Sequence, residues 1–434
     1  MKWILALIAF FIFIILLVTP SITNKYYDLA KRFRMLEEKT DSYGRYLASN
    51  LETYQKTRKP IRIYSKLNDN IRFNWKELEV PWDKSQFSKI KALEVWNDNL
   101  VVGLLGNTKG SISIYIYDEK KWIQLLGVKN NFIKEWEKLN YVQVLKVHNE
   151  KLYAGINNTV WMLDEKNKWV PVGVNKENSY PWGDGIAYSM ASYNDYLYLG
   201  ITGKASSVYR LNKSEWEKVS LGLDEHANQG IYELLSHSDG KLYATNVSTF
   251  NSTVVYQFDE KNIRWNTIGG KGINDSWISN GFTHGLSLSS HKESLFITMN
   301  RHPNIWGKFS SVWAYDDNKW FAIGNKNPPK DWNEIDTFNA SISFKNMMFI
   351  GVGGSPAGNS SVWVLDKNQW VLIGGKGVNN SWGLNFPHTI ANNFRHTVEE
   401  YVYRFVEWND SLIVGFGEGK NISKLWRLSI GDKR

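Results

Sequence analysis

The sequence contains no cysteine among its 434 residues. This absence excludes disulfide scaffolds, thiolate metal sites, cysteine nucleophiles and any cofactor built on a cysteine–tyrosine link. The sequence also lacks phosphate-binding loops, a His-Glu-x-x-His motif and aspartate-rich calcium loops. We therefore predict no cofactor and no metal.

Charge of one sign is not concentrated anywhere in the chain. Lys and Arg number 52 against 43 Asp and Glu, which gives a formal net charge of +9, but no long basic block occurs. A thinly spread excess is typical of a solvated, mildly basic surface, so we predict no nucleic-acid partner. Such a surface would suit an anionic cell envelope.

Aromatic residues, in contrast, are abundant. The chain has 21 Trp, 22 Tyr and 20 Phe, and 43% of its residues are apolar. A chain of this length can bury about three quarters of its unfolded surface. A folded globular protein is predicted, and disordered or fibrous chains are excluded.

The N-terminus begins with sixteen consecutive apolar residues, at positions 3–18. This run predicts a signal anchor or signal peptide at residues 1–21. Apolar residues then recur every three or four positions, which predicts a helical stalk at 22–58. The expected location is the cell membrane, with one span and the large domain outside the cytoplasm, or secretion if the signal is cleaved. The basic residues Lys25, Lys31, Arg32 and Arg34 indicate the opposite orientation, so both remain open.

A repeat of about fifty residues fills the rest of the chain. A short apolar strand after a polar turn occurs seven times, ending at Gly103, Gly155, Gly200, Thr245, Thr298, Gly351 and Gly415. An alternating strand follows each copy, as in Thr159 to Asp164 and Ser361 to Asp366. Six of these strands lead through a polar turn to a tryptophan: Trp122, Trp169, Trp216, Trp265, Trp320 and Trp370. This period suits a four-stranded propeller blade.

The last repeat lacks its tryptophan, and an unpaired segment at the start of the domain supplies one at Trp75. We therefore predict that the strand around Trp75 completes the last blade, which would remove both exposed sheet edges. The predicted fold is all-β: a seven-bladed β-propeller at residues 59–434, closed by an N-terminal strand and preceded by the hydrophobic helix and the helical stalk.

The order of apolar strand, Val-Trp-x-Leu-Asp strand and tryptophan after a short turn resembles the kelch-type β-propeller repeat, over roughly residues 61 to 430. The resemblance implies a propeller fold, which is used by binding modules and by some enzymes. The copper oxidases of that group are excluded because their cofactor needs a cysteine.

Long loops of the predicted propeller carry a second tryptophan pattern. Residues 269–277 and 374–382 are near copies that end in Trp277 and Trp382, and looser versions include Trp182 and Trp332. Two interpretations stay open: plugs packed between blades, or aromatic platforms that stack on sugars. Trp277, Trp382, Trp332, Trp182 and Trp306 are the candidate ligand-binding residues.

Ionisable residues cluster in two long loops on the same predicted rim. The candidates for catalysis are His388, Arg395, His396 and Glu399 in one loop and Arg301 and His302 in the other. Their spacing matches no metal site, and loop anchoring explains them as well as catalysis does. In addition, Tyr188, Tyr232 and Tyr403 hold equivalent places near the starts of innermost strands, where they would narrow the channel mouth.

These observations predict a membrane-tethered binding module outside the cytoplasm. Its long-loop rim would recognise a glycan, a cell-envelope polymer or a protein partner. The alternative is a carbohydrate-active enzyme, either a lyase, a hydrolase or a sugar epimerase, with its site at the channel mouth. An enzyme requires several polar side chains that converge in one pocket, whereas a binding module does not.

Overall fold

The structure is a computed structural model. It describes Leu67 and residues 70–127, 139, 141–174, 179–203, 207–223, 230–247, 253–277, 282–301, 311–323, 337–353, 360–375, 377–382, 401–417 and 423–432. The chain divides into two compact parts, Met1–Arg62 and Ile63–Arg434. The predicted signal segment and stalk lie outside the described residues. Within the described part of the chain, no helix has the length and hydrophobicity needed to cross a bilayer.

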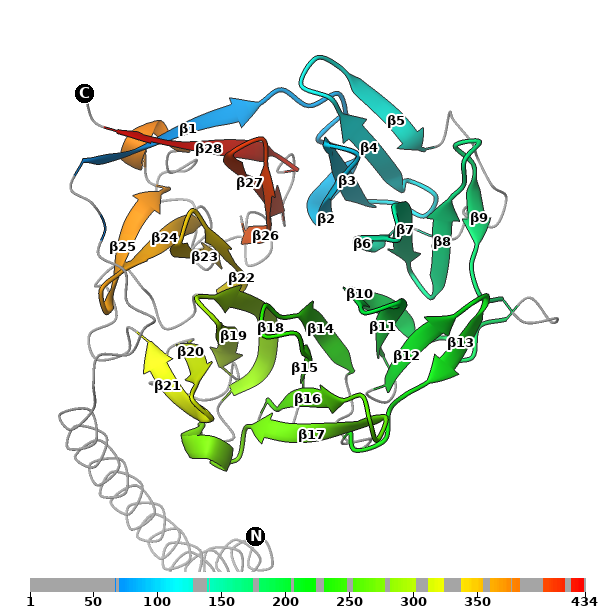
Figure 1. The fold of residues 1–434 in the computed structure, drawn as a ribbon. Helices are drawn as coiled ribbons and strands as arrows, with labels where there is room; N and C mark the ends of the chain where they lie inside the picture. The colour runs from blue at the N-terminus through cyan, green and yellow to red at the C-terminus, as the bar shows by residue number, and fades with distance from the viewer. Residues whose placement is uncertain are drawn as a thin grey trace, which may run out of the picture. The chain divides into compact units, whose positions relative to one another are not determined.

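The described residues form antiparallel β-sheets and no α-helix, which confirms the all-β prediction. Most strands belong to four-stranded sheets, in which sequence neighbours pair in order (Figure 1). We call each such set of four strands a four-strand unit. Five are separate sheets: β6 (Val142–His148), β7 (Lys151–Ile156), β8 (Thr159–Leu163) and β9 (Trp169–Pro171); β10 (Ile186–Tyr193), β11 (Tyr196–Thr202), β12 (Ser207–Asn212) and β13 (Glu215–Lys218); β14 (Ile231–Ser236), β15 (Leu242–Asn246), β16 (Val255–Asp259) and β17 (Arg264–Gly269); β18 (Phe282–His291), β19 (Ser294–Arg301), β20 (Ser311–Asp316) and β21 (Lys319–Ile323); β22 (Thr337–Phe344), β23 (Met347–Gly353), β24 (Ser361–Asp366) and β25 (Gln369–Gly374).

The remaining strands form an eight-stranded sheet made of two such units. One contains β2 (Phe87–Trp96), β3 (Asn99–Gly106), β4 (Ser113–Tyr117) and β5 (Trp122–Leu126), and the other contains β26 (Tyr401–Trp408), β27 (Ser411–Gly417), β28 (Leu425–Asp432) and β1 (Ile71–Leu78). They join only at the pair Lys89 and Gly417. Two 3-10 turns, η2 (Ile273–Asp275) and η3 (Val378–Asn380), follow β17 and β25.

Strand β1 pairs with β28 along its whole length, with Trp75 opposite Leu428. The first strand of each unit contacts the first strand of the next, and β26 contacts β2. In Figure 1 these first strands lie innermost and the fourth strands outermost. The arrangement is propeller-like.

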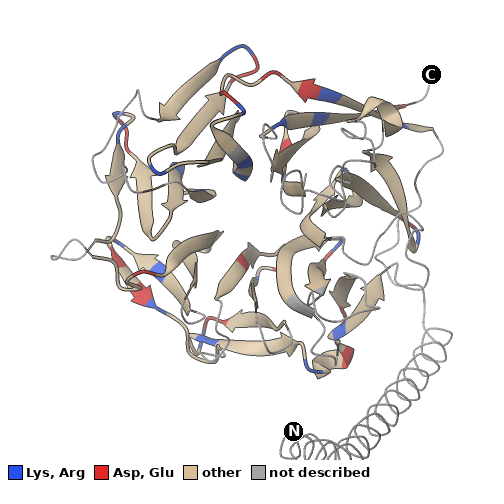
Figure 2. Ribbon diagram, turned by 180° about the vertical axis from the view of Figure 1, so that it is seen from behind, with Lys and Arg blue, Asp and Glu red and all other residues tan. Residues whose placement is uncertain are grey.

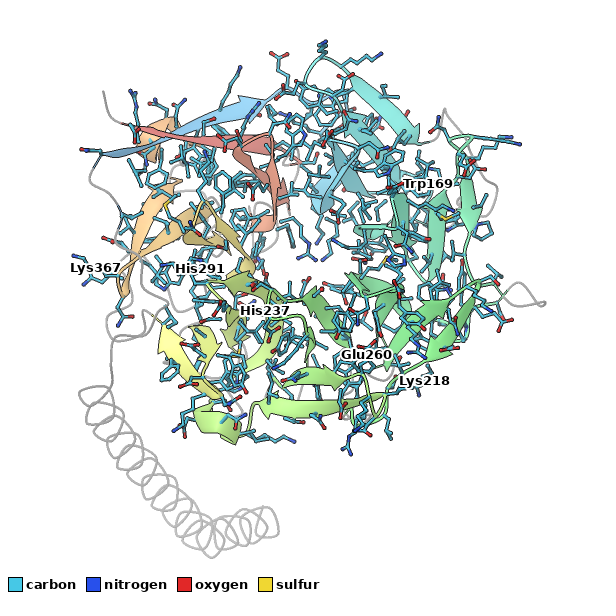
Figure 3. All side chains as sticks on the ribbon, in the orientation of Figure 1. Trp169, Lys218, His237, Glu260, His291 and Lys367 are labelled. Carbon is cyan, nitrogen blue, oxygen red and sulfur yellow. The ribbon has the colours of Figure 1, made fainter. Side chains whose placement is uncertain are left out.

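Tryptophans of the outermost strands fasten each unit to the one before it. Each indole Nε1 donates a hydrogen bond to a backbone carbonyl at the outer edge of the preceding unit. The pairs are Trp75 to Ile373 (2.7 Å), Trp122 to Glu79 (2.9 Å), Trp169 to Leu125 (3.2 Å), Trp216 to Val172 (3.0 Å), Trp265 to Val219 (2.7 Å), Trp320 to Ile268 (2.8 Å) and Trp370 to Ile323 (3.4 Å). Figure 3 labels Trp169. The tryptophan that recurs in the sequence therefore links each sheet to the preceding one by a hydrogen bond.

A second set of contacts joins neighbouring units at the short hairpins between first and second strands. Each contact runs from the end of one inner strand, or its turn, to the next unit. The pairs are Trp96 Nε1 to Glu150 O (2.8 Å), His148 Nδ1 and Ser192 Oγ (2.8 Å), Tyr193 OH to Gly240 O (3.2 Å), Ser238 Oγ and Ser290 Oγ (2.6 Å), His291 Nδ1 and Ser343 Oγ (2.8 Å), Lys345 Nζ to Asp410 Oδ2 (2.8 Å), and Trp408 Nε1 to Asp98 O (2.8 Å). Neighbouring units are thus joined both at their outermost strands and at the hairpins that follow their innermost strands.

Glycine occurs inside five of the seven apolar second strands, and close packing against the next unit explains it. A Cβ on Gly351 would lie 2.7 Å from Val402 Cβ, on the inner strand of the next unit. Where the second strand has Thr245 instead, the facing residue is Gly285, and a Cβ there would collide with the Thr245 hydroxyl. One member of each facing pair must therefore be small, because neighbouring sheets approach closely at this level.

Trp75→Phe should lower the free energy of unfolding by about 1–3 kcal/mol, because the buried Ile373 carbonyl loses its donor. Trp122→Phe should lower the free energy of unfolding by less, because the Glu79 carbonyl that loses its donor is more exposed to water. Urea denaturation of both variants measures the difference. Equal stability of Trp75→Phe and wild type would contradict the role given to this bond.

Gly351→Ala should destabilise the protein by about 1–3 kcal/mol through overpacking against Val402. Gly431→Ala is the matched control, since a Cβ there meets no atom within 4 Å. Adding Val402→Ala to Gly351→Ala should recover part of the loss. Thermal unfolding tests both expectations, and similar melting temperatures for the two glycine variants would contradict the packing cause.

Candidate functional site

A cavity of about 490 Å³ lies among the inner strands of five units. Its walls come from residues 92–94 of β2, 144–147 of β6, 188–192 of β10, 233–236 of β14, and 404–405 of β26. A volume of this size falls in the range of about 300–1,000 Å³ that is typical of small-molecule sites. The cavity is therefore the candidate functional site.

Charged side chains face one another in this cavity. Lys146 Nζ lies 2.9 Å from Glu94 Oε2, which joins β6 to β2. Arg404 Nη1 lies 3.9 Å from Glu233 Oε2 and so spans from β26 to β14, two strands that are not neighbours in the order of inner strands. Figure 2 shows basic and acidic residues on the strands nearest the centre as well as on the outer edge. The inner strands, otherwise apolar, thus carry a polar site.

A lysine–tyrosine cluster adjoins the charged groups, formed by Lys89, Lys91, Tyr188, Tyr232 and Tyr403. Lys91 Nζ donates to Tyr188 OH at 3.0 Å and lies 5.3 Å from the centre of the Tyr403 ring. Lys89 Nζ donates to Tyr403 OH at 3.2 Å. The rings of Tyr188 and Tyr232 are 4.3 Å apart. The ammonium groups are thus held by aromatic rings and phenol oxygens, a favourable arrangement for partly buried cations.

Bulges in the inner strands place several of these side chains. The pairing of each inner strand with its second strand skips at least one residue near its start, as at Tyr188, Tyr232, Tyr403 and Lys91. A bulge turns a side chain away from the regular alternation. The three tyrosines do hold equivalent places, as their spacing in the sequence indicated.

Burial raises the pKa of the Glu233 carboxyl, and the positive charges of Arg404, Lys146 and Lys91 oppose the rise without cancelling it. Burial also raises the pKa of Tyr232, with a further contribution from Tyr188. The neutral form of Glu233 is therefore favoured more than it would be in water. Within the described part of the chain, no cluster of acidic and histidine side chains is arranged to hold a metal ion.

Three of the tryptophans predicted as ligand platforms are buried. Trp182, Trp277 and Trp382 are 7%, 3% and 5% exposed, and each Nε1 donates to a backbone carbonyl at 2.8 Å. Each ring meets the edge of an outer-strand tryptophan, with centroids 5.1 to 5.6 Å apart, and Trp82 does the same. Rings this buried offer no face to a sugar, so the platform interpretation of these three is corrected: they pack between sheets.

The other predicted site residues are not placed by the structure. Arg301 ends β19, and its side chain is not described. The remaining candidates lie outside the described residues and stay predictions: His302, Trp306, Trp332, His388, Arg395, His396 and Glu399.

The sequence reasoning missed the charged residues of the cavity. Lys91, Lys146, Glu233 and Arg404 each interrupt an apolar inner strand, in the segments IKALEV, VLKVH, YELLS and YRFVE. A charge inside an otherwise buried strand is a usable signal, because such a group is seldom buried without a partner or a function.

No family model and no curated protein sequence matches this chain, so the resemblance to kelch repeats stays an expectation. The fold is similar to that of the extracellular domain of a protein described as a hybrid two component system from B. thetaiotaomicron, with 12% identity and a TM-score of 0.53 over 82% of this chain and 39% of that chain. It is also similar to the GH74 xyloglucanase from Xanthomonas campestris, with 9% identity and a TM-score of 0.51 over 82% of this chain and 55% of that chain. This chain therefore spans about 39% to 55% of the length of these proteins. At these identities the similarity shows the fold alone.

Glu233→Gln should stabilise the protein more at pH 7 than at pH 4. Because the folded pKa of Glu233 is raised, the stability it contributes is present below the unfolded pKa of about 4.3 and is lost as pH rises through the folded value. Glutamine stays neutral and avoids this loss. Melting temperatures of both proteins at the two pH values measure the effect.

Glu217→Gln is the matched control, because its effect on stability should depend on pH in the opposite direction. Hydrogen bonds from Asn212 and Arg210 hold the pKa of Glu217 below its usual value, so its contribution is present at pH 7 and is lost as pH falls. A pH dependence of the same sign in both variants would contradict the effect of burial on Glu233.

Proposed function

We propose that this chain is an extracytoplasmic β-propeller that binds a glycan or cell-envelope polymer, or a protein partner, with the central cavity as a ligand site. The observation that carries the proposal is the cavity itself. Five strands from different sheets converge on it, and they bring Glu94, Lys146, Glu233 and Arg404 together in one concave space. Binding sites commonly combine an enclosed space with a few oriented polar groups.

The proposal includes a closed ring of seven blades, with β1 as the outermost strand of the last. It is supported by the pairing of β1 with β28 and by the bond from Trp75 to Ile373. The contacts between successive inner strands, which return from β26 to β2, also support it. A closed ring would hold the cavity walls at fixed separations.

The proposed location outside the cytoplasm rests on two supports. The apolar run at residues 3–18 is typical of an export signal or membrane tether. In addition, the fold resembles an extracellular domain and a xyloglucanase, which are compatible with a glycan-related role. The long-loop rim stays part of the proposed binding surface, with Trp306 and Trp332 as its candidate platforms.

A carbohydrate-active enzyme is a second candidate, and one observation favours it. The burial that raises the pKa of Glu233 suits a general acid, which must hold its proton near neutral pH. His388, Arg395, His396 and Glu399 would act with it only if their loop reaches the channel mouth.

The purified full-length chain should be retained on an array of neutral and anionic glycans and envelope polymers. Leu93→Trp should weaken this binding at least tenfold, because Leu93 lines the cavity and the larger indole would fill it. Leu221→Trp is the control, since Leu221 is 67% exposed. Absence of any retained glycan or polymer would contradict a glycan or envelope-polymer ligand and would leave only a protein partner. Release of cleaved products, lost in Glu233→Gln, would favour the enzyme.

A further inference from the structure

Positively charged side chains outnumber negatively charged ones in and beside the cavity. Lys146 and Arg404 line the cavity, and Lys91 is close enough to act electrostatically on Glu233. Two carboxyl groups, Glu94 and Glu233, oppose these three cations. With both carboxyls ionised the local charge is +1, and it rises when Glu233 holds its proton. A site with net positive charge attracts an anionic ligand more strongly than a neutral one.

Arg404 has donor capacity left for a ligand. Its Nη1 lies 3.9 Å from Glu233 Oε2, too far for a hydrogen bond, and 3.4 Å from the Tyr403 carbonyl oxygen. Among the described residues, neither Nε nor Nη2 has a partner. A guanidinium binds a carboxylate through two parallel N–H donors, and here Glu233 does not occupy them.

Lys146 and Glu233 complete the polar side of the site. The side chains of Lys146, Glu233 and Arg404 are 32%, 23% and 22% exposed, so the cavity leaves space around all three. Burial favours the protonated form of Glu233, which can donate its O–H to a ligand oxygen instead of repelling an anion. The ammonium group of Lys146, which donates a hydrogen bond to Glu94, adds a positive charge from strand β6.

Apolar side chains form the other part of the wall. Leu93, Leu235 and Phe405 are partly buried and line the same cavity. A sugar ring presents polar hydroxyl groups at its edge and C–H groups on its faces, so a wall of mixed character fits it. A sugar acid combines such a ring with one carboxylate.

We propose that the central cavity binds a carboxylate-bearing sugar, with its carboxylate held by the Arg404 guanidinium and its ring against Leu93, Leu235 and Phe405. The proposal rests on the proposed function, because it assigns a ligand class to the same site. Uronic acids, either free or at the end of a polymer, have this chemistry.

Isothermal titration calorimetry of the full-length chain with glucuronate, galacturonate, glucose, galactose and inorganic phosphate tests the proposal. At least one uronate should bind at least tenfold more tightly than its neutral counterpart with a hydroxymethyl group in place of the carboxylate, which is glucose for glucuronate and galactose for galacturonate. Binding of phosphate in preference to both uronates, or equal binding of the uronates and their neutral counterparts, would overturn the proposal. A further titration with an oligouronate shows whether the site prefers the end of a polymer or the free sugar.

Arg404→Gln should weaken uronate binding at least tenfold and leave glucose binding unchanged. Arg404→Lys keeps the charge but loses the paired donors, so it should give an intermediate loss and provides a second variant if the first fails to fold. Arg427→Gln is the matched control, since Arg427 lies on β28 and contacts Glu119 and Ser411 outside the cavity wall. Unchanged uronate binding in a folded Arg404 variant would overturn the proposal.

The two proposals fail in different ways. If the array retains a neutral glycan and Leu93→Trp abolishes that binding while neither uronate binds, the function stands and the ligand class is wrong. If nothing is retained on the array and neither uronate binds, the uronate assignment and the glycan or polymer function are both wrong. Uronate binding that survives Leu93→Trp would place the ligand elsewhere and overturn the assignment to the cavity.

Discussion

The structure depends on one repeated interaction, the hydrogen bond from an outer-strand indole to a carbonyl of the preceding sheet. A four-stranded sheet with apolar faces must bury those faces against neighbouring elements. The indole covers a large apolar area and satisfies a backbone acceptor at the same time. At four junctions a loop tryptophan meets this ring edge-on, as Trp382 meets Trp75 and Trp277 meets Trp320. The high tryptophan content is therefore explained largely by contacts between sheets.

The candidate site follows from the same architecture. Inner strands are crowded by neighbours on both sides, which is why Gly351 faces Val402 and Gly285 faces Thr245 without room for another methyl group. Bulges interrupt the regular alternation at one or two residues in each inner strand, and they turn Tyr188, Lys91 and their equivalents away from it. Polar groups are thus gathered at the centre of an otherwise apolar framework, and several are held by one another.

Much of the fold was accessible from the sequence, because the repeat fixes strand order and period. The spacing of Trp122 to Trp370 predicted the four-stranded sheets, and the unpaired strand around Trp75 predicted its pairing with the last repeat. The site was less accessible. Whether Trp277 packs or binds depends on its burial, which the pattern GGKGINDSW does not encode. The meeting of Arg404 with Glu233 depends on contacts across the centre between residues 171 positions apart, and no local spacing signals it.

The pairing of β1 with β28 also has a consequence for how the chain is made. Trp75 and its carbonyl partner Ile373 are separated by 298 positions, and β1, the first strand in the described part of the chain, has no strand partner until β28 has been synthesised. Contacts of such long range are slow to form, and an unpaired edge is prone to aggregate meanwhile. The edge of β1 therefore stays unpaired in a nascent chain until β28 emerges, and a truncation that removes β28 would leave it unpaired.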